Sequence, residues 1–108
     1  MGYYLQIDTD DPAPLASNNG WGDVIKWAAK LPAARASAIN HLCQFGWQDS
    51  VTLLKIELEE CLKDSPPKDP QTQATVKNFI ALLVSHKDKD GKDKAKVVSV
   101  TDGLGYSE

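Results

Sequence analysis

Hydrophobic residues recur in the segment 50–62 with the spacing of a helix that buries one side. At about 100° per residue, the apolar positions fall on a single stripe. This stripe consists of Val51, Leu54, Leu58, Cys61 and Leu62. Charged residues take most of the remaining circumference, but Leu53 and Ile56 lie among them. The pattern therefore predicts a core helix with a second, smaller apolar spot on its outer side.

The same spacing predicts three further helices, at 21–31, from Pro32 to about Phe45, and from about Pro70 to about Ser85. Trp27 is expected at the edge of the first helix's buried face. Gly46 predicts a left-handed cap at the end of the second helix. The residues expected to face inward are Trp21, Val24, Ile25, Ala28 and Leu31, then Ala38, Ile39, Leu42, Cys43 and Phe45, then Val76, Phe79, Ile80, Leu82, Leu83 and Val84.

Aromatic and branched residues predict one strand near each end of the chain, at 3–8 and at 95–101. Pro12 and Pro14 are expected to prevent regular structure from the first strand to about Ala16. A lone strand cannot satisfy its own backbone hydrogen bonds, so the two strands are expected to pair, in either direction. The predicted fold is α+β and mostly helical, with about four helices packed on a small sheet formed by the N- and C-terminal strands.

The length of 108 residues is typical of one small globular domain. We expect residues 1–108 to form that domain, with a polar loop at 86–94 and a frayed tail at 104–108. The net charge of −3 disfavours binding to nucleic acid or to an anionic membrane, because both need a basic field. No apolar run approaches the roughly 20 residues of a membrane span.

Targeting signals and cysteine usage predict a cytoplasmic protein. The first residues carry no basic region, so they do not resemble a signal peptide. Cys43 and Cys61 both fall on apolar helix stripes, and in a reducing compartment they are expected to be buried free thiols.

An acidic cluster, Asp8-Thr9-Asp10-Asp11, directly follows the residues Tyr4-Leu5-Gln6-Ile7 of the first predicted strand. A hydrophobic strand that ends in Asp-x-Asp resembles the nucleophile motif of the haloacid-dehalogenase-like phosphotransferases. The resemblance implies a Mg²⁺ site in which one carboxylate attacks phosphorus. Asp102 would join Asp8 and Asp10 if the two strands were parallel. The chain lacks the repeated strand–helix units of that family, and a solvated loop whose acids cap turns is the simpler interpretation.

The other candidate chemistry lacks the required spacing. The histidines and cysteines do not form the paired short spacings of a structural zinc site. His41 would point about 200° away from Cys43 on a helix, so it is not placed as a base for that thiol. Residues 88–93 do not fit the register of a calcium-binding loop. Acidic residues on the outer side of the helix at 50–62 would repel DNA phosphates. We therefore expect no cofactor and no catalytic residue.

The outer apolar spot remains as the functional candidate. Leu53 and Ile56 are three residues apart and therefore neighbours on the helix surface, with Glu57, Glu60 and Lys63 in the charged rim. An apolar centre within a charged rim is typical of protein interfaces. The alternative is that the proline-rich connector or a terminal strand covers both side chains.

Together, these patterns favour a small cytosolic protein-interaction or regulatory module without catalytic activity. Its partner would be an unknown protein or a second copy of the chain, with no nucleic acid and no membrane. The alternative is a small Mg²⁺-dependent phosphate-processing enzyme that uses Asp8 and Asp10.

Overall fold

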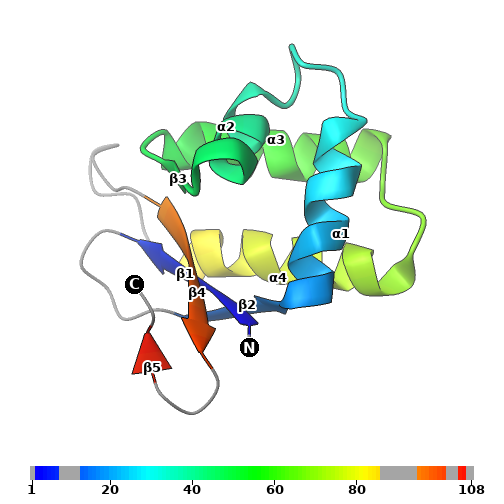
Figure 1. The fold of residues 1–108 in the computed structure, drawn as a ribbon. Helices are drawn as coiled ribbons and strands as arrows, with labels where there is room; N and C mark the ends of the chain where they lie inside the picture. Colours follow the sequence, from blue (N-terminus) through cyan, green and yellow to red (C-terminus); the bar gives the residue numbers. More distant parts are fainter. Residues whose placement is uncertain (1, 8–12, 86–94, 102–104, 107–108) are drawn as a thin grey trace.

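The computed structural model describes residues 2–7, 13–85, 95–101 and 105–106. It confirms the predicted α+β class, with helices packed on a small antiparallel sheet (Figure 1). The described helices are α1 (Asn18–Ala29), α2 (Ser37–Phe45), α3 (Val51–Asp64) and α4 (Pro70–Ser85). The described strands are β1 (Gly2–Ile7), β2 (Ala13–Ser17), β3 (Trp47–Gln48), β4 (Ala95–Thr101) and β5 (Gly105–Tyr106).

The two terminal strands pair, as predicted, and their direction is antiparallel. The ladder between β1 and β4 runs from Gly2 opposite Val100 to Ile7 opposite Ala95. The strand order is β2-β1-β4-β3, and β5 also pairs with β4. Thus β1 and β4 lie at the centre of the sheet and the short strands extend it on both sides.

The segment 13–17 forms an edge strand, so the prediction that prolines prevent regular structure there is wrong. Pro14 has no N–H to donate, but a strand at the edge of a sheet can tolerate this loss. The side-chain amide of Asn78 on α4 donates to the carbonyl oxygens of Pro14, at 3.3 Å, and Leu15, at 3.2 Å. Helix α4 therefore occupies part of this exposed edge.

Two further short strands were not predicted. The dipeptide β3 follows the end of α2 and pairs with the start of β4. Residues 105–106, expected in a frayed tail, form β5 against the end of β4. The predicted loop at 86–94 lies outside the described residues.

The helix ends follow local capping chemistry. Ser17 caps α1 by accepting a hydrogen bond from the backbone N–H of Gly20 at 3.1 Å. Gly46 has the predicted left-handed conformation, with φ 79°, and its N–H donates to the carbonyl of Leu42. By contrast, α2 begins at Ser37 and not near Pro32, because residues 31–36 form turns.

The core lies between the helices and the sheet, and most of the expected inward residues are buried. Trp27 is buried although it was expected at an edge, because its indole Nε1–H donates to the carbonyl of Ser65 in the connector at 2.8 Å. Ile25, Phe45 and Val84 were expected inside but are exposed. The main core residues are Leu5, Ile7, Trp21, Val24, Ala28, Ile39, Leu42, Leu54, Leu58, Val76, Phe79 and Leu83.

Candidate functional site

Helix α3 carries the candidate interaction surface, and its inner side fixes how that surface is oriented. Val51, Leu54, Leu58 and Cys61 are buried, as the apolar stripe predicts, and Leu62 is half-buried. This side packs against α2 and α4. The opposite side of α3 is thereby turned away from the core.

Glu57 is the exception on the inner side: it is only 6% exposed although it was predicted among the outward charges. Its Oε1 accepts hydrogen bonds from the backbone N–H groups of Ala38, at 2.9 Å, and Ile39, at 3.1 Å. Its Oε2 accepts from the hydroxyl of Ser37 at 3.2 Å.

These contacts make Glu57 the N-terminal cap of α2. The residue at the cap position of α2 itself, Ala36, has no side chain that can accept a hydrogen bond. A carboxylate at this end also interacts favourably with the helix dipole. Glu57 is thus a structural residue that joins α3 to α2, which explains why a charged side chain is buried here.

The outer side of α3 exposes the predicted apolar spot. Leu53 is 46% exposed and Ile56 is 42% exposed, so neither the connector nor a described strand covers them. Glu60 and Lys63 are also exposed, and they continue the same line along the helix. We call the four residues Leu53, Ile56, Glu60 and Lys63 the α3 stripe.

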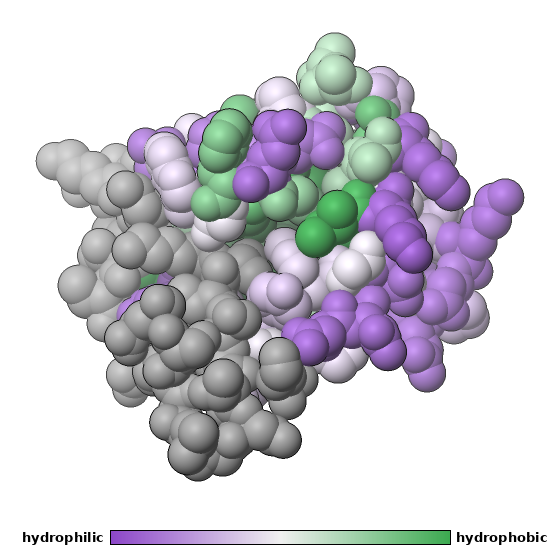
Figure 2. All heavy atoms as spheres, in the orientation of Figure 1, coloured by the Kyte–Doolittle hydropathy of each residue, from purple (hydrophilic) through white to green (hydrophobic). Residues whose placement is uncertain are grey.

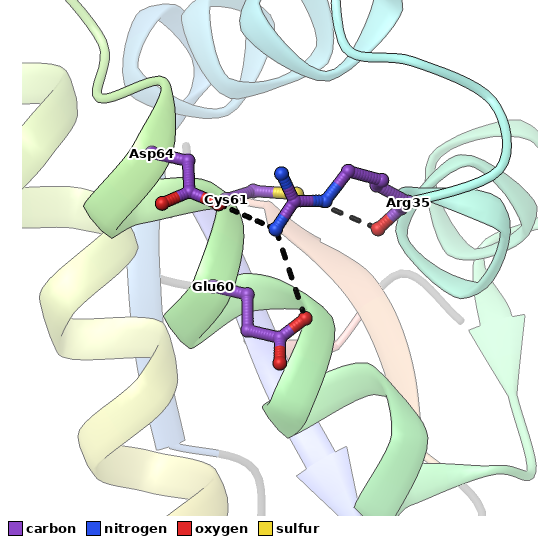
Figure 3. A network of polar contacts seen from close by, with 4 residues as sticks. All are labelled: Arg35, Glu60, Cys61 and Asp64. Carbon is purple, nitrogen blue, oxygen red and sulfur yellow. Dashed lines mark hydrogen bonds and ion pairs between the residues drawn. The ribbon is translucent and has the colours of Figure 1, made fainter.

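An ion-pair network marks the C-terminal end of the α3 stripe (Figure 3). Arg35, from the turn between α1 and α2, pairs with Asp64 and lies 3.9 Å from a carboxylate oxygen of Glu60. The Cys61 thiol donates to the backbone carbonyl of Arg35 at 3.5 Å. The hydrogen bond and the charge of Asp64 raise the pKa of Arg35, as expected for a guanidinium beside a carboxylate.

A cluster of aromatic rings at the end of α2 was not predicted. His41 lies between Phe45 and Trp47, with both ring centroids 4.8 Å from its own. Its Nδ1 is 2.8 Å from the carbonyl oxygen of Trp47. Phe45 is 61% exposed. Its place in the last turn of α2, directly before the chain reverses at Gly46, is the sequence signal that could have indicated this exposure.

The two cysteines are free thiols. Burial raises the pKa of Cys43 to about 11, so its sulfur is a thiol at neutral pH and a poor nucleophile. The ring of His41 is engaged with Phe45 and Trp47. The geometry therefore gives no support for a cysteine–histidine pair.

The proposed metal ligands Asp8, Asp10 and Asp102 lie outside the described residues. The ends of the strands that precede them are described: Ile7 lies opposite Ala95, whereas Thr101 lies at the other end of β4. The parallel pairing that would bring Asp102 to the first two acids is therefore not the one found. Within the described ranges, no group of three or more His, Cys, Asp or Glu residues could hold a metal ion.

Comparison of the chain with protein-family models, with curated proteins and with solved structures finds no match. Among the helices that the structure describes, none is both long and apolar enough to cross a membrane. Any functional assignment therefore depends on the surface chemistry of the chain itself.

Proposed function

We propose that this protein is a small interaction or regulatory module that binds an amphipathic helix of another protein along the α3 stripe. The observation that supports the proposal is the exposure of Leu53 and Ile56, side by side on a helix whose opposite side is buried. Single exposed apolar residues are common on protein surfaces, but adjacent ones framed by charges are typical of contact sites.

The shape and charge of the α3 stripe favour a helical partner. The spacing 53, 56, 60 and 63 follows one line along α3, and a partner helix can lie along such a line with its own apolar residues at matching intervals. Glu60 and Lys63 carry opposite charges at one end. A partner with a basic residue opposite Glu60 and an acidic residue opposite Lys63 would bind in a single register.

The small size of the apolar centre favours a transient complex with a different protein over a stable homodimer. A stable interface buries roughly 800 Å² on each partner, far more than two aliphatic side chains provide. We further propose that the module acts in the cytoplasm, where Cys43 and Cys61 would remain reduced.

Charge substitutions on the α3 stripe test the proposal. Wild-type protein, Leu53→Glu and Ile56→Glu are each used to capture partners from the native cell, and the dissociation constant of each identified partner is then measured. We expect both variants to bind at least about tenfold more weakly, because the new carboxylate would be left unpaired at the centre of the interface.

Ile25→Glu provides the matched control, because it places the same charge on an exposed aliphatic residue of α1. We expect this variant to bind like the wild type, and all three variants to keep their free energy of unfolding within about 0.5–1 kcal/mol. A partner that binds all three variants equally well would contradict the proposal. A concentration-dependent dimer in sedimentation experiments that the substitution Leu53→Glu dissociates would also contradict it. The α3 stripe would then bind a second copy of this chain and not a different protein.

A further inference from the structure

A cavity of about 350 Å³ lies away from the α3 stripe, between α1, the connector after α3 and the start of α4. Its inner wall is formed by residues that are themselves buried, including Trp27, Leu31 and Pro67. Lys26, Lys30 and Lys68 line it from exposed positions. Figure 2 shows hydrophilic side chains gathered over this part of the molecule, on the right of the view.

The walls of the cavity are fixed by hydrogen bonds between its elements. The indole of Trp27 is held by the carbonyl of Ser65, and the side-chain amide of Gln73 donates to the carbonyl of Pro67 at 2.6 Å. Asp69 holds the first turn of α4 by accepting from the hydroxyl of Thr72 at 3.2 Å. A preformed site of this kind loses little conformational entropy when a ligand binds.

The charges around the cavity favour an anion, although the whole chain carries a net charge of −3. Within the residues that the structure describes, no ion pair joins Lys26, Lys30 or Lys68 to an acidic side chain. Asp23 and Asp69 also line the cavity, but the carboxylate of Asp69 is already engaged with the first turn of α4. With three lysines against two aspartates, the lining carries a net charge of +1, and a bound anion would find ammonium groups that no described ion pair occupies.

We propose that this cavity binds a small aromatic carboxylate, with its ring against Trp27, Leu31 and Pro67 and its carboxylate toward the lysines at the rim. The volume lies at the lower end of the range for small-molecule pockets, roughly 300–1,000 Å³, which fits a ligand of one or two rings. An apolar wall with few charged groups at one side is the usual arrangement of such sites. The site shares no residue with the α3 stripe.

Titration of the full chain with 2-naphthoate, followed by NMR of backbone amides and tryptophan indoles, tests this assignment. We expect saturable shifts of the Trp27 indole and of amides in the connector at 65–69. The neutral amide of the same ring, 2-naphthamide, should bind at least about tenfold more weakly, because it gives the lysines no charge to pair with. The absence of saturable shifts at millimolar 2-naphthoate would overturn the proposal, as would equal binding of the two probes.

Lysine substitutions test whether the lysines at the rim of the cavity bind the carboxylate of the ligand. The triple variant Lys26→Gln, Lys30→Gln and Lys68→Gln should bind 2-naphthoate at least about tenfold more weakly than the wild type. A second triple variant, Lys55→Gln, Lys63→Gln and Lys77→Gln, removes the same charge from residues that do not line the cavity.

We expect this control to bind like the wild type, and equal weakening of both triple variants would overturn the assignment. Leu53→Glu should leave 2-naphthoate binding unchanged. The two proposals can therefore fail independently: unchanged partner binding by Leu53→Glu says nothing against the cavity, and the absence of saturable 2-naphthoate binding says nothing against the α3 stripe.

Discussion

Each side of α3 carries residues that depart from the usual relation between hydropathy and burial. On the inner side, the carboxylate of Glu57 is 6% exposed, while on the outer side Leu53 and Ile56 are 46% and 42% exposed. This difference in exposure depends on which segments surround each side chain, because all three residues belong to the same helix. The N-terminus of α2 supplies hydrogen-bond donors to Glu57, whereas Leu53 and Ile56 keep nearly half of their surface in contact with water. A residue's partner, more than its own polarity, decides where it can lie.

Leu58→Ala probes the inner side and should have the largest effect. Leu58 is fully buried within the core, so removing its branched end leaves a cavity that the packed neighbours can fill only in part. We expect the free energy of unfolding to fall by about 3–5 kcal/mol, measured by urea denaturation with far-UV circular dichroism. A loss below about 1 kcal/mol would show that this side of α3 is not the core-facing side.

Glu57→Ala tests whether the buried carboxylate stabilises the fold as a cap. The substitution removes the acceptor for the N–H groups of Ala38 and Ile39, and these donors would be left unpaired in a buried place. We expect a loss of about 2–3 kcal/mol in the free energy of unfolding. Glu57→Gln keeps one oxygen acceptor, so its free energy of unfolding should fall by less, about 1 kcal/mol.

Glu60→Ala is the matched control for this cap, since it removes a glutamate from the exposed side of the same helix. Its free energy of unfolding should stay close to that of the wild type. If Glu57→Ala and Glu60→Ala had the same free energy of unfolding, the assignment of Glu57 as the cap of α2 would be wrong.

The main features that the sequence predicts are those set by local periodicity and local capping. The start of α4 at Pro70, the cap at Gly46 and the pairing of the end strands all follow from nearby residues or from the need to satisfy a strand. The strand at 13–17 was missed because a proline is tolerated only at a sheet edge, and which strand lies at the edge is a property of the whole sheet.

Glu57 was missed for a related reason. Its partners lie 18 and 19 residues earlier in the chain, so its helical position places it among the outward charges unless the packing of α2 on α3 is known. For the α3 stripe, periodicity indicates the side of the helix but not whether another segment covers it. The path of the connector decides this, because Ser65 packs on Trp27 of α1 and leaves Leu53 and Ile56 exposed.

Arg35→Ala tests the boundary between the two sides of α3, where Arg35 pairs with Asp64 and approaches Glu60. All three side chains are about half exposed, so water and salt screen the pairs. We expect a smaller shift of the urea midpoint than Glu57→Ala produces, and a shift that shrinks further as salt is raised. If Arg35→Ala lowered the urea midpoint as much as Glu57→Ala does, and salt did not change this effect, Arg35 would instead stabilise the fold through buried contacts.

Leu53→Ala repeats the substitution made at Leu58 on the same helix, but on the exposed side. Because nearly half of the Leu53 side chain already contacts water, its removal leaves no buried cavity. Alanine is also the stronger helix former, which offsets part of the lost contact with Ile56. We expect the free energy of unfolding to change by no more than about 0.5 kcal/mol in either direction, by the same urea denaturation as for Leu58→Ala. A loss close to that of Leu58→Ala would mean that Leu53 is packed in solution, and the α3 stripe would then not be available to a partner.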